Sequence, residues 1–234
     1  MGVKIRSRLE IRSRTYFSIG HIQSAALFTR LSHKIEKNYD GRFSPELDSE
    51  CRSYVTGAIF AAVAFLEATI NEFLMDITDK SVEKRQHLEQ KDITMIANLW
   101  ARDIFGRLST LEKYQIALIL AGKEIFDTNI NPYQDVSYLV KLRNALIHYE
   151  PEWIIDISEI NEIEPHKFES MLKGKFNLNP IAGDGNPFYP HKCLGHGCAE
   201  WAVNSSIKFV DEFFGKRGTI PIFNHIRGEL ETKI

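Results

Sequence analysis

Residues 46–78 carry a long, uninterrupted helical pattern, and this pattern restricts the possible folds more than any other feature of the chain. Apolar residues recur there every three or four positions, which predicts one helix that starts after Ser44-Pro45. They are Val55, Ile59, Ala62, Val63, Leu66, Ile70, Phe73, Leu74 and Ile77. Small residues occupy the opposite face, at Gly57, Ala61, Ala64 and Ala68. Small side chains let another backbone approach closely, so we expect this helix to pack on both sides.

Shorter helical patterns dominate the rest of the chain. They predict helices at residues 19–38, 92–108, 134–149 and 198–214, and at most one short helix near 165–173. Ser109 and Glu112 have the spacing of a capping box, which predicts a further helix that Gly122 ends. Residues 79–91 are typical of a charged linker, and residues 151–197 are the least regular part because Pro, Gly and Asn cluster there. The predicted fold class is mainly α.

The N-terminus adds a minor β element to this prediction. Residues 3–14 alternate with period two, which predicts a strand with one basic face. Arg6, Arg8 and Arg12 lie on that face. One interpretation is an edge strand whose charges prevent edge-to-edge pairing. The other is a stripe of cations that contacts the phosphates of RNA.

Composition excludes several classes of protein. A chain of 234 residues with 44% hydrophobic residues can form one ordered domain with a core of its own. Three cysteines argue against a disulfide framework and indicate a cytoplasmic location. A formal net charge of −2 restricts any nucleic-acid binding to a local patch. Residues 55–66 come closest to a membrane span, but Glu67 ends them, and no signal-peptide core precedes them.

Three polar residues interrupt the helical segment LVKLRNALIHYEPEW at residues 139–153. On a helical wheel, its core face is formed by Leu139, Leu142, Leu146 and Tyr149. Asn144 and His148 lie one turn apart on the side that faces away from this core, and the long side chain of Arg143 can reach toward His148. The three residues therefore form a second, polar face of the helix.

The segment Arg143-Asn144-Ala145-Leu146-Ile147-His148 resembles the R-N-x-x-x-H motif of HEPN (higher eukaryotes and prokaryotes nucleotide-binding) domains. Its context is similar as well, in the segments AAVAFLEATINEFL, LEKYQIALILAGKEIFD, VSYLVKLRNALIHYEPEW and CAEWAVNSSIKFVDEFF. The resemblance implies an antiparallel helical bundle at residues 46–215. An N-terminal extension at residues 1–45 precedes this domain, and a C-terminal tail at residues 216–234 follows it.

The resemblance also implies a homodimer that brings two such motifs into one cleft, and a metal-independent endoribonuclease without a cofactor. His148 would act as general acid or base while the RNA 2′-hydroxyl attacks the adjacent phosphate, and Arg143 would stabilise the charge on the phosphorane. Asn144 would orient His148 or donate a further hydrogen bond, and Lys141 would help to bind RNA. The family setting implied is a toxin or phage-defence system with an antitoxin or defence partner protein. Some HEPN domains are inactive, so the alternative is a dimerisation, interaction or nucleotide-binding module.

Glu67 and Asn71 lie one turn apart beside the apolar stripe of the long helix. A carboxylate in such a context needs a partner. Either the pair fixes helix packing, or it orients Arg143 or His148 from a second layer around the site.

His191, Cys193, His196 and Cys198 place four potential metal donors within eight residues. Their H-x-C-x-x-H-x-C spacing is not one of the usual zinc patterns, so a structural loop is favoured over a metal site.

The last expectation concerns dimerisation. In-line attack on a phosphate needs groups on two opposite sides, and each chain offers one imidazole in this motif. We expect the small-residue face at Gly57, Ala61, Ala64 and Ala68 and the outward face of residues 134–149 to meet a symmetry mate.

Overall fold

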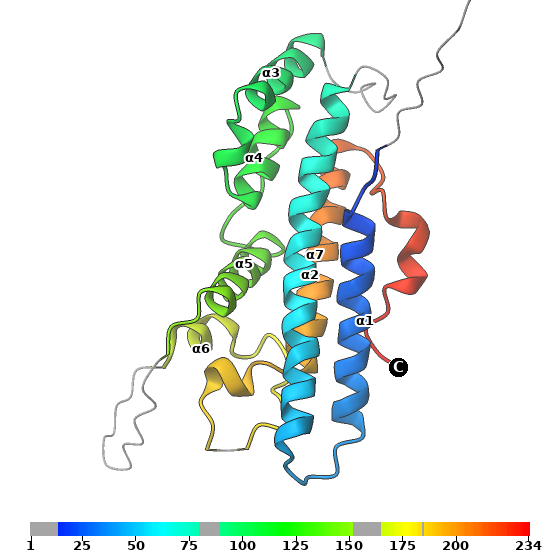
Figure 1. The fold of residues 1–234 in the computed structure, drawn as a ribbon. Helices are drawn as coiled ribbons and strands as arrows, with labels where there is room; N and C mark the ends of the chain where they lie inside the picture. Colours follow the sequence, from blue (N-terminus) through cyan, green and yellow to red (C-terminus); the bar gives the residue numbers. More distant parts are fainter. Residues whose placement is uncertain (1–13, 80–88, 152–164, 184) are drawn as a thin grey trace, which may run out of the picture.

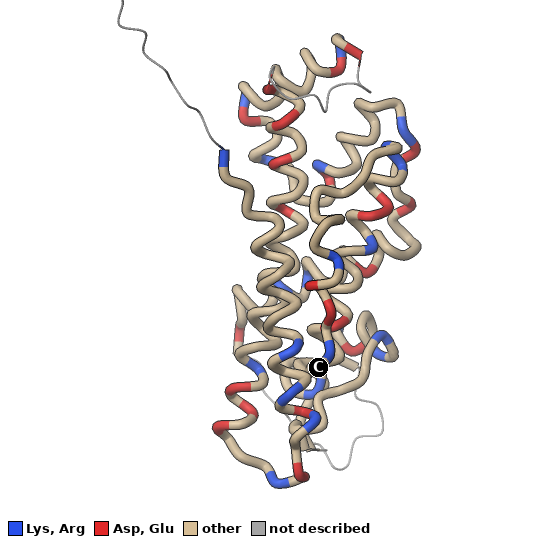
Figure 2. Tube along the Cα trace, turned by 90° about the vertical axis from the view of Figure 1, so that its right-hand side faces the viewer, with Lys and Arg blue, Asp and Glu red and all other residues tan. Residues whose placement is uncertain are grey.

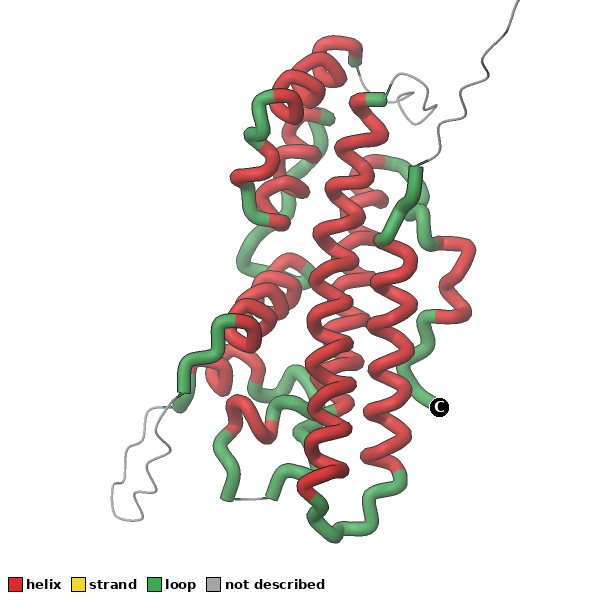
Figure 3. Tube along the Cα trace, in the orientation of Figure 1, coloured by secondary structure: helices red, strands yellow, loops and turns green. Residues whose placement is uncertain are grey.

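The computed structural model of the protein describes residues 14–79, 89–151, 165–183 and 185–234. Within these ranges every regular element is a helix and no strand occurs (Figure 3). This confirms the mainly α prediction. The N-terminal strand was predicted almost entirely for residues outside the described ranges, and Arg14, its last residue, is not in a strand.

Three long helices form the body of the molecule. They are α1 (Ser18–Lys37), α2 (Pro45–Thr78) and α7 (His196–Arg217), and they lie side by side in Figure 1. The shorter helices α3 (Gln90–Ala101), α4 (Thr110–Leu120), α5 (Tyr133–Ile147) and α6 (Lys167–Leu172) lie along one side of this body (Figure 1). Short helical segments at Phe105–Arg107, Phe188–Lys192 and Asn224–Glu229 complete the helical elements of the described residues.

Local signals explain why α2 begins where it does. The Ser44 hydroxyl accepts a hydrogen bond from the Leu47 N–H at 3.3 Å, and Pro45 occupies the first helical position. Glu46 and Asp48 place negative charge in the first turn, where the helix dipole favours it. The apolar stripe of α2 is buried from Val55 to Ile77 except for the half-buried Phe73, so the predicted core helix is confirmed.

At Gly57 the small-residue face of α2 packs against α1 of the same chain. A Cβ atom on Gly57 would lie 3.0 Å from the Phe28 ring of α1, and Ala61 is buried. Phe28 therefore occupies part of the face, at Gly57, that the sequence analysis expected to meet a symmetry mate. Ala64 and Ala68 are half-buried.

By length and composition alone, α2 is the one helix of the described chain that is apolar enough to cross a membrane. Half of its most apolar 18-residue window is buried inside the molecule. The stripe that gives α2 this character is the one that the neighbouring helices cover, as is typical of the central helix of a bundle.

Several predicted helix ends differ from the observed ones for identifiable reasons. The helix predicted to reach residue 108 ends at Ala101, because Asp103 adopts a left-handed conformation with φ of 53°. The last long helix extends to Arg217, where Gly218 with φ of 71° closes it. The capping box of Ser109 and Glu112 is present as predicted.

The C-terminal segment packs along α1. The Gln23 amide donates to the Glu229 carboxylate at 2.6 Å, and the Arg30 guanidinium donates to the carbonyl oxygens of Glu229 and Glu231 at 3.1 and 2.7 Å. Figure 1 shows this segment on the outer side of α1. Because α1 itself packs on α2 and α7, residues that precede the predicted domain 46–215 in the sequence are part of the bundle. Residues that follow it pack on α1 and so contribute as well.

Charges of both signs are spread over the surface. Figure 2 shows basic and acidic positions interspersed along the described helices and loops. A surface of this kind binds a polyanion only through a local cluster of cations.

Candidate functional site

The polar face predicted on α5 is oriented by the core on its opposite side. Val136, Leu139 and Leu142 are fully buried against the bundle. Arg143 is half-buried, whereas Asn144 and His148 are exposed. The separation of an apolar and a polar face is therefore confirmed for this part of the helix.

The end of α5 differs from the prediction. The helix ends at Ile147, and His148 is its C-cap, with its N–H bonded to the Asn144 carbonyl at 2.9 Å. Tyr149 was predicted on the core face, but its side chain is 48% exposed. The chain has already left the helical phase at this position, so the helical wheel no longer applies to it.

His148 lines a surface pocket of about 230 Å³. The other walls include Glu150, Lys167 and Tyr189, which come from three different segments of the chain. Tyr189 stacks on the His166 ring at a centroid distance of 5.0 Å. Arg143 and Asn144 lie outside this pocket. The single chain thus places an imidazole, a lysine and a carboxylate around one hollow, and the last two were not predicted from the sequence.

The side chains of Arg143, Asn144 and His148 have no hydrogen-bond or ion-pair partner among the described residues. Lys141 is exposed on the same helix, and its ammonium lies 5.6 Å from the Tyr138 ring centroid. These polar groups are therefore available to an external ligand or to a second subunit. Arg6, Arg8 and Arg12, the other predicted RNA-binding residues, lie outside the described residues.

Glu67 and Asn71 meet α4 rather than α5. The buried Lys113 ammonium donates to the Asn71 side-chain oxygen at 3.0 Å and lies 4.0 Å from the Glu67 carboxylate. This contact fits the helix-packing interpretation of the pair. The described chain shows no contact between either residue and the α5 residues Arg143 or His148.

The four potential metal donors near the start of α7 do not come together as one group of ligands in the described chain. Cys193 and Cys198 are fully buried free thiols. Burial raises the pKa of Cys193 to about 12, and it also raises the pKa of Cys198. No group of three or more potential ligands gathers within the described part of the chain. Cys198 occupies the core, in agreement with its interpretation as a small apolar residue.

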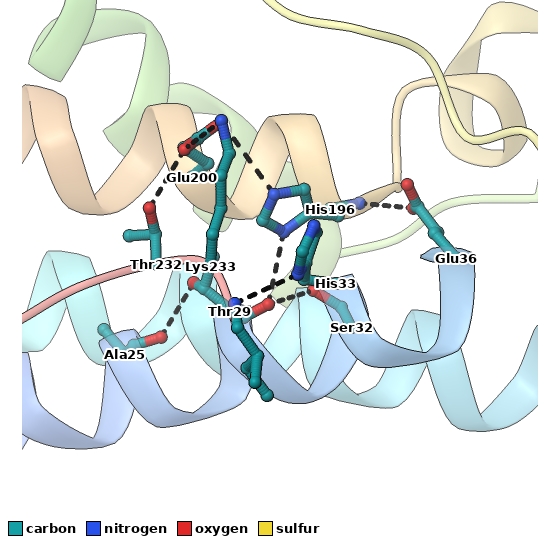
Figure 4. Close-up of polar contacts among 10 residues, drawn as sticks. Ala25, Thr29, Ser32, His33, Glu36, His196, Glu200, Thr232 and Lys233 are labelled. Atoms are coloured by element: carbon teal, nitrogen blue, oxygen red, sulfur yellow. Dashed lines mark hydrogen bonds and ion pairs between the residues drawn. The ribbon is translucent and has the colours of Figure 1, made fainter. Parts of the chain in front are cut away.

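His196 belongs instead to a polar cluster that the sequence analysis missed. The cluster consists of His33 and Glu36 on α1, His196 and Glu200 on α7, and Lys233 of the C-terminal segment (Figure 4). In Figure 4 the His196 ring lies between Glu36 on one side and Glu200 with Lys233 on the other. The spacings His33–Glu36 and His196–Glu200 put each pair on one helical face, and this was the only signal of the cluster in the sequence.

Short contacts hold this cluster together. The Glu36 carboxylate accepts a hydrogen bond from the backbone N–H of His196 at 2.5 Å. The ring nitrogen Nδ1 of His196 lies 3.2 Å from the Thr29 carbonyl oxygen. The Glu200 carboxylate lies 3.0 Å from the Lys233 ammonium. The His33 and His196 rings are 4.7 Å apart between centroids.

Burial dominates the acid–base properties of the cluster. It raises the pKa of Glu36 to about 7, although the hydrogen bond from the His196 N–H acts in the opposite direction. Burial lowers the pKa of His196, because the charged imidazolium loses solvation. Burial alone would raise the pKa of Glu200, but Lys233 and Thr232 outweigh it and lower that pKa.

The raised pKa of Glu36 predicts how stability depends on pH. The folded chain holds this proton more tightly than the unfolded chain, whose ordinary value is 4.5. The stabilising contribution of the protonated Glu36 carboxyl to the free energy of unfolding is therefore fully present below about pH 4.5. It is lost as the pH rises through about 7. Glu36→Gln keeps an acceptor for the His196 N–H and carries no charge. We expect the free energy of unfolding of Glu36→Gln, minus that of wild type, to increase from pH 5 to pH 8. Urea unfolding at each pH measures this difference, and the linkage relation gives its slope.

The exposed Glu231→Gln variant is the matched control, and its stability relative to wild type should stay constant across the same range. A Glu36→Gln difference that is equally constant with pH would contradict a proton-dependent contribution of Glu36.

Comparison of the chain with models of protein families, with curated proteins and with solved structures finds no match.

Proposed function

We propose that the protein is a metal-independent endoribonuclease of HEPN type that acts as a homodimer. The observation that carries this proposal is the state of His148, an exposed imidazole at the end of α5 without an internal partner. It lies five residues after Arg143, in the motif on which the HEPN resemblance depends. Because it is exposed, this imidazole is accessible to a substrate in solution.

The proposed reaction uses the nucleophile that RNA itself carries. One His148 removes the proton of a 2′-hydroxyl, which attacks the adjacent phosphorus while the bond to the 5′-oxygen breaks. A second imidazole on the opposite side returns a proton to the leaving 5′-oxygen. Arg143 offers a planar set of donors to the phosphorane oxygens, and Asn144 orients His148 or adds a hydrogen bond. The products are a 2′,3′-cyclic phosphate and a 5′-hydroxyl.

Cations near His148 support the binding of RNA in this proposal. Lys167 shares the His148 pocket, and Lys141 is exposed one to two turns earlier on α5. Such lysines contact phosphates without reading base sequence. A cytoplasmic toxin or phage-defence setting with a partner protein is part of the same proposal.

The test of the activity is cleavage of single-stranded RNA in the presence of EDTA. Wild-type protein should release fragments that end in 2′,3′-cyclic phosphate. If diverse RNAs remain intact, the proposal fails in favour of the alternative, a non-catalytic interaction or nucleotide-binding module that uses the same polar face.

The two-subunit site predicts a specific result when subunits are mixed. In an equal mixture of wild type and His148→Ala, random pairing leaves about one quarter of the dimers with two intact imidazoles. If acid and base come from different subunits, activity per total protein should fall to about a quarter of the wild-type value after subunit exchange. Activity near one half would show that each subunit acts alone. Sedimentation of the mixture verifies that dimers are present.

A further inference from the structure

The pocket that His148 lines also contains aromatic side chains and a carboxylate. Its walls come from the end of α5 and the residues after it, from α6 and from the segment Phe188–Lys192. Figure 1 shows α6 beside the end of α5. The pocket volume of about 230 Å³ is below the roughly 300–1,000 Å³ of sites that hold a drug-sized ligand. It therefore fits one flat ring system better than a whole nucleotide.

Three aromatic rings give the pocket its apolar wall. Phe168 and Tyr189 are buried, and their centroids are 4.8 Å apart. Tyr149 is exposed, and the one described ring in aromatic contact with it is Tyr189, at 6.3 Å between centroids and tilted by 45°. The Tyr149 ring is therefore accessible from solvent and is not stacked on another ring of the described chain. Such a ring offers a nucleobase a surface on which to stack.

Glu150 adds an unpaired carboxylate to the same pocket. Its side chain is exposed and has no hydrogen-bond or ion-pair partner in the described part of the chain. A carboxylate only accepts hydrogen bonds, and its two oxygens match a ligand that offers two parallel donors. Its negative charge also repels a phosphate, so this part of the pocket suits an uncharged base better than the RNA backbone.

Guanine is the base whose Watson–Crick edge offers two such donors. Its N1–H and N2–H groups point in the same direction, whereas uracil has one donor between two carbonyl oxygens. Adenine and cytosine have an amino group beside a ring nitrogen that accepts. A carboxylate opposite any of these three bases would therefore face at least one acceptor. Single-stranded RNA leaves the Watson–Crick edge open to a protein, which a base-paired duplex does not.

We propose that this pocket selects a guanine of single-stranded RNA, an inference whose role in cleavage rests on the ribonuclease function proposed above. The base stacks on Tyr149, and its N1–H and N2–H groups donate to the Glu150 carboxylate. Because His148 lines the same pocket, the ribose and phosphate attached to this base lie close to the imidazole. The exposed Lys167 contacts a phosphate of the same strand. Cleavage is therefore expected next to guanines.

The test measures binding separately from cleavage. Labelled 2′-fluoro RNA hexamers lack the attacking hydroxyl, so their fluorescence anisotropy with the full chain gives an affinity that does not depend on catalysis. One hexamer contains only uridine, and two others carry a single guanine or a single adenine in that background. Wild type should bind the guanine hexamer about tenfold more tightly than the adenine hexamer, because a hydrogen bond to a charged group is lost with adenine.

Two variants separate the two contacts with the base. Glu150→Gln replaces one acceptor oxygen by an amide donor, so the guanine and adenine hexamers should bind about equally. Tyr149→Ala should weaken the binding of both hexamers about tenfold, because stacking does not depend on the identity of the base. Glu231→Gln, at an exposed glutamate outside the pocket, is the matched control and should keep the guanine preference. Since Tyr149 and Glu150 are exposed, both variants should unfold at the wild-type urea concentration.

Wild-type affinity for the adenine hexamer that equals or exceeds that for the guanine hexamer would overturn this proposal. It would also be overturned if no hexamer binds, or if Glu150→Gln keeps the guanine preference. Cleavage of unmodified RNA judges the ribonuclease function separately. A guanine preference without cleavage would support the base pocket and reject the enzyme, and cleavage without a guanine preference would do the reverse.

Discussion

Replacing His148 with alanine is expected to reduce the rate of RNA cleavage by about 10²–10⁴-fold, the usual contribution of a positioned general acid or base. The reason is that His148 is the one imidazole among the described residues of α5 and its C-cap. Single-turnover cleavage of a labelled RNA, with the variant in excess over RNA, measures this effect without a contribution from product release. The fold should be unaffected, because His148 is exposed and has no internal partner.

His225→Ala is the matched control, since His225 is another exposed histidine and lies in the turn Asn224–Glu229. It should cleave at the wild-type rate. Arg143→Lys should retain the charge but lose the bidentate geometry, so a rate between those of wild type and Arg143→Ala is expected. Equal cleavage by wild type and His148→Ala would show that the observed activity comes from another site or from a contaminant.

Phe209→Ala is expected to destabilise the protein by about 3–5 kcal/mol, the range for removing a large aromatic side chain from a core. Phe209 of α7 is fully buried and stacks on Phe126 with centroids 4.5 Å apart. Its ring also meets Tyr114 of α4 at 4.8 Å and Tyr133 of α5 at 6.1 Å. One side chain thus joins three segments of the layer that positions α5, and its loss leaves a cavity between them. The midpoint of urea unfolding, followed by circular dichroism, measures the loss.

Phe43→Ala serves as the matched control, because Phe43 is 62% exposed in the segment before α2. Its unfolding free energy should change by less than about 0.5 kcal/mol, as for most surface substitutions. If Phe209→Ala were equally mild, the packing of α4 and α5 on α7 described above would be incorrect.

The helices were predictable because their local signals are strong. The stripe of α2, the Ser44 cap and the Ser109–Glu112 capping box all appear in the structure as the sequence indicates. The sequence was not informative where tertiary contacts, or the backbone conformation of one residue, determine the end of a helix or the neighbour of a helix face. The left-handed Asp103 shortens α3, and Phe28 of α1 packs on Gly57 of α2, a contact that no local pattern indicates.

The two candidate sites differ in how far a sequence can reveal them. Arg143, Asn144 and His148 lie within six residues, so their shared face on α5 follows from helical geometry. The contact between Glu36 and His196 spans 160 positions of the chain. Each residue is ordinary in its own helix, and only the packing of α1 against α7 makes the Glu36 carboxylate half-buried. No periodicity in the sequence carries that information.

The path of the C-terminal segment along α1 has a consequence for how the chain folds. The hydrogen bonds from Arg30 reach carbonyl groups about 200 residues later, and the backbone N–H of Ile234 donates to His33. The α1–α2 hairpin is local and can form early, but its outer side is covered only after a very long loop has closed. During synthesis α1 therefore emerges long before α7 and the C-terminal segment, and part of its apolar surface stays accessible until they arrive. Chaperones that recognise exposed apolar helices would meet this face on the nascent chain.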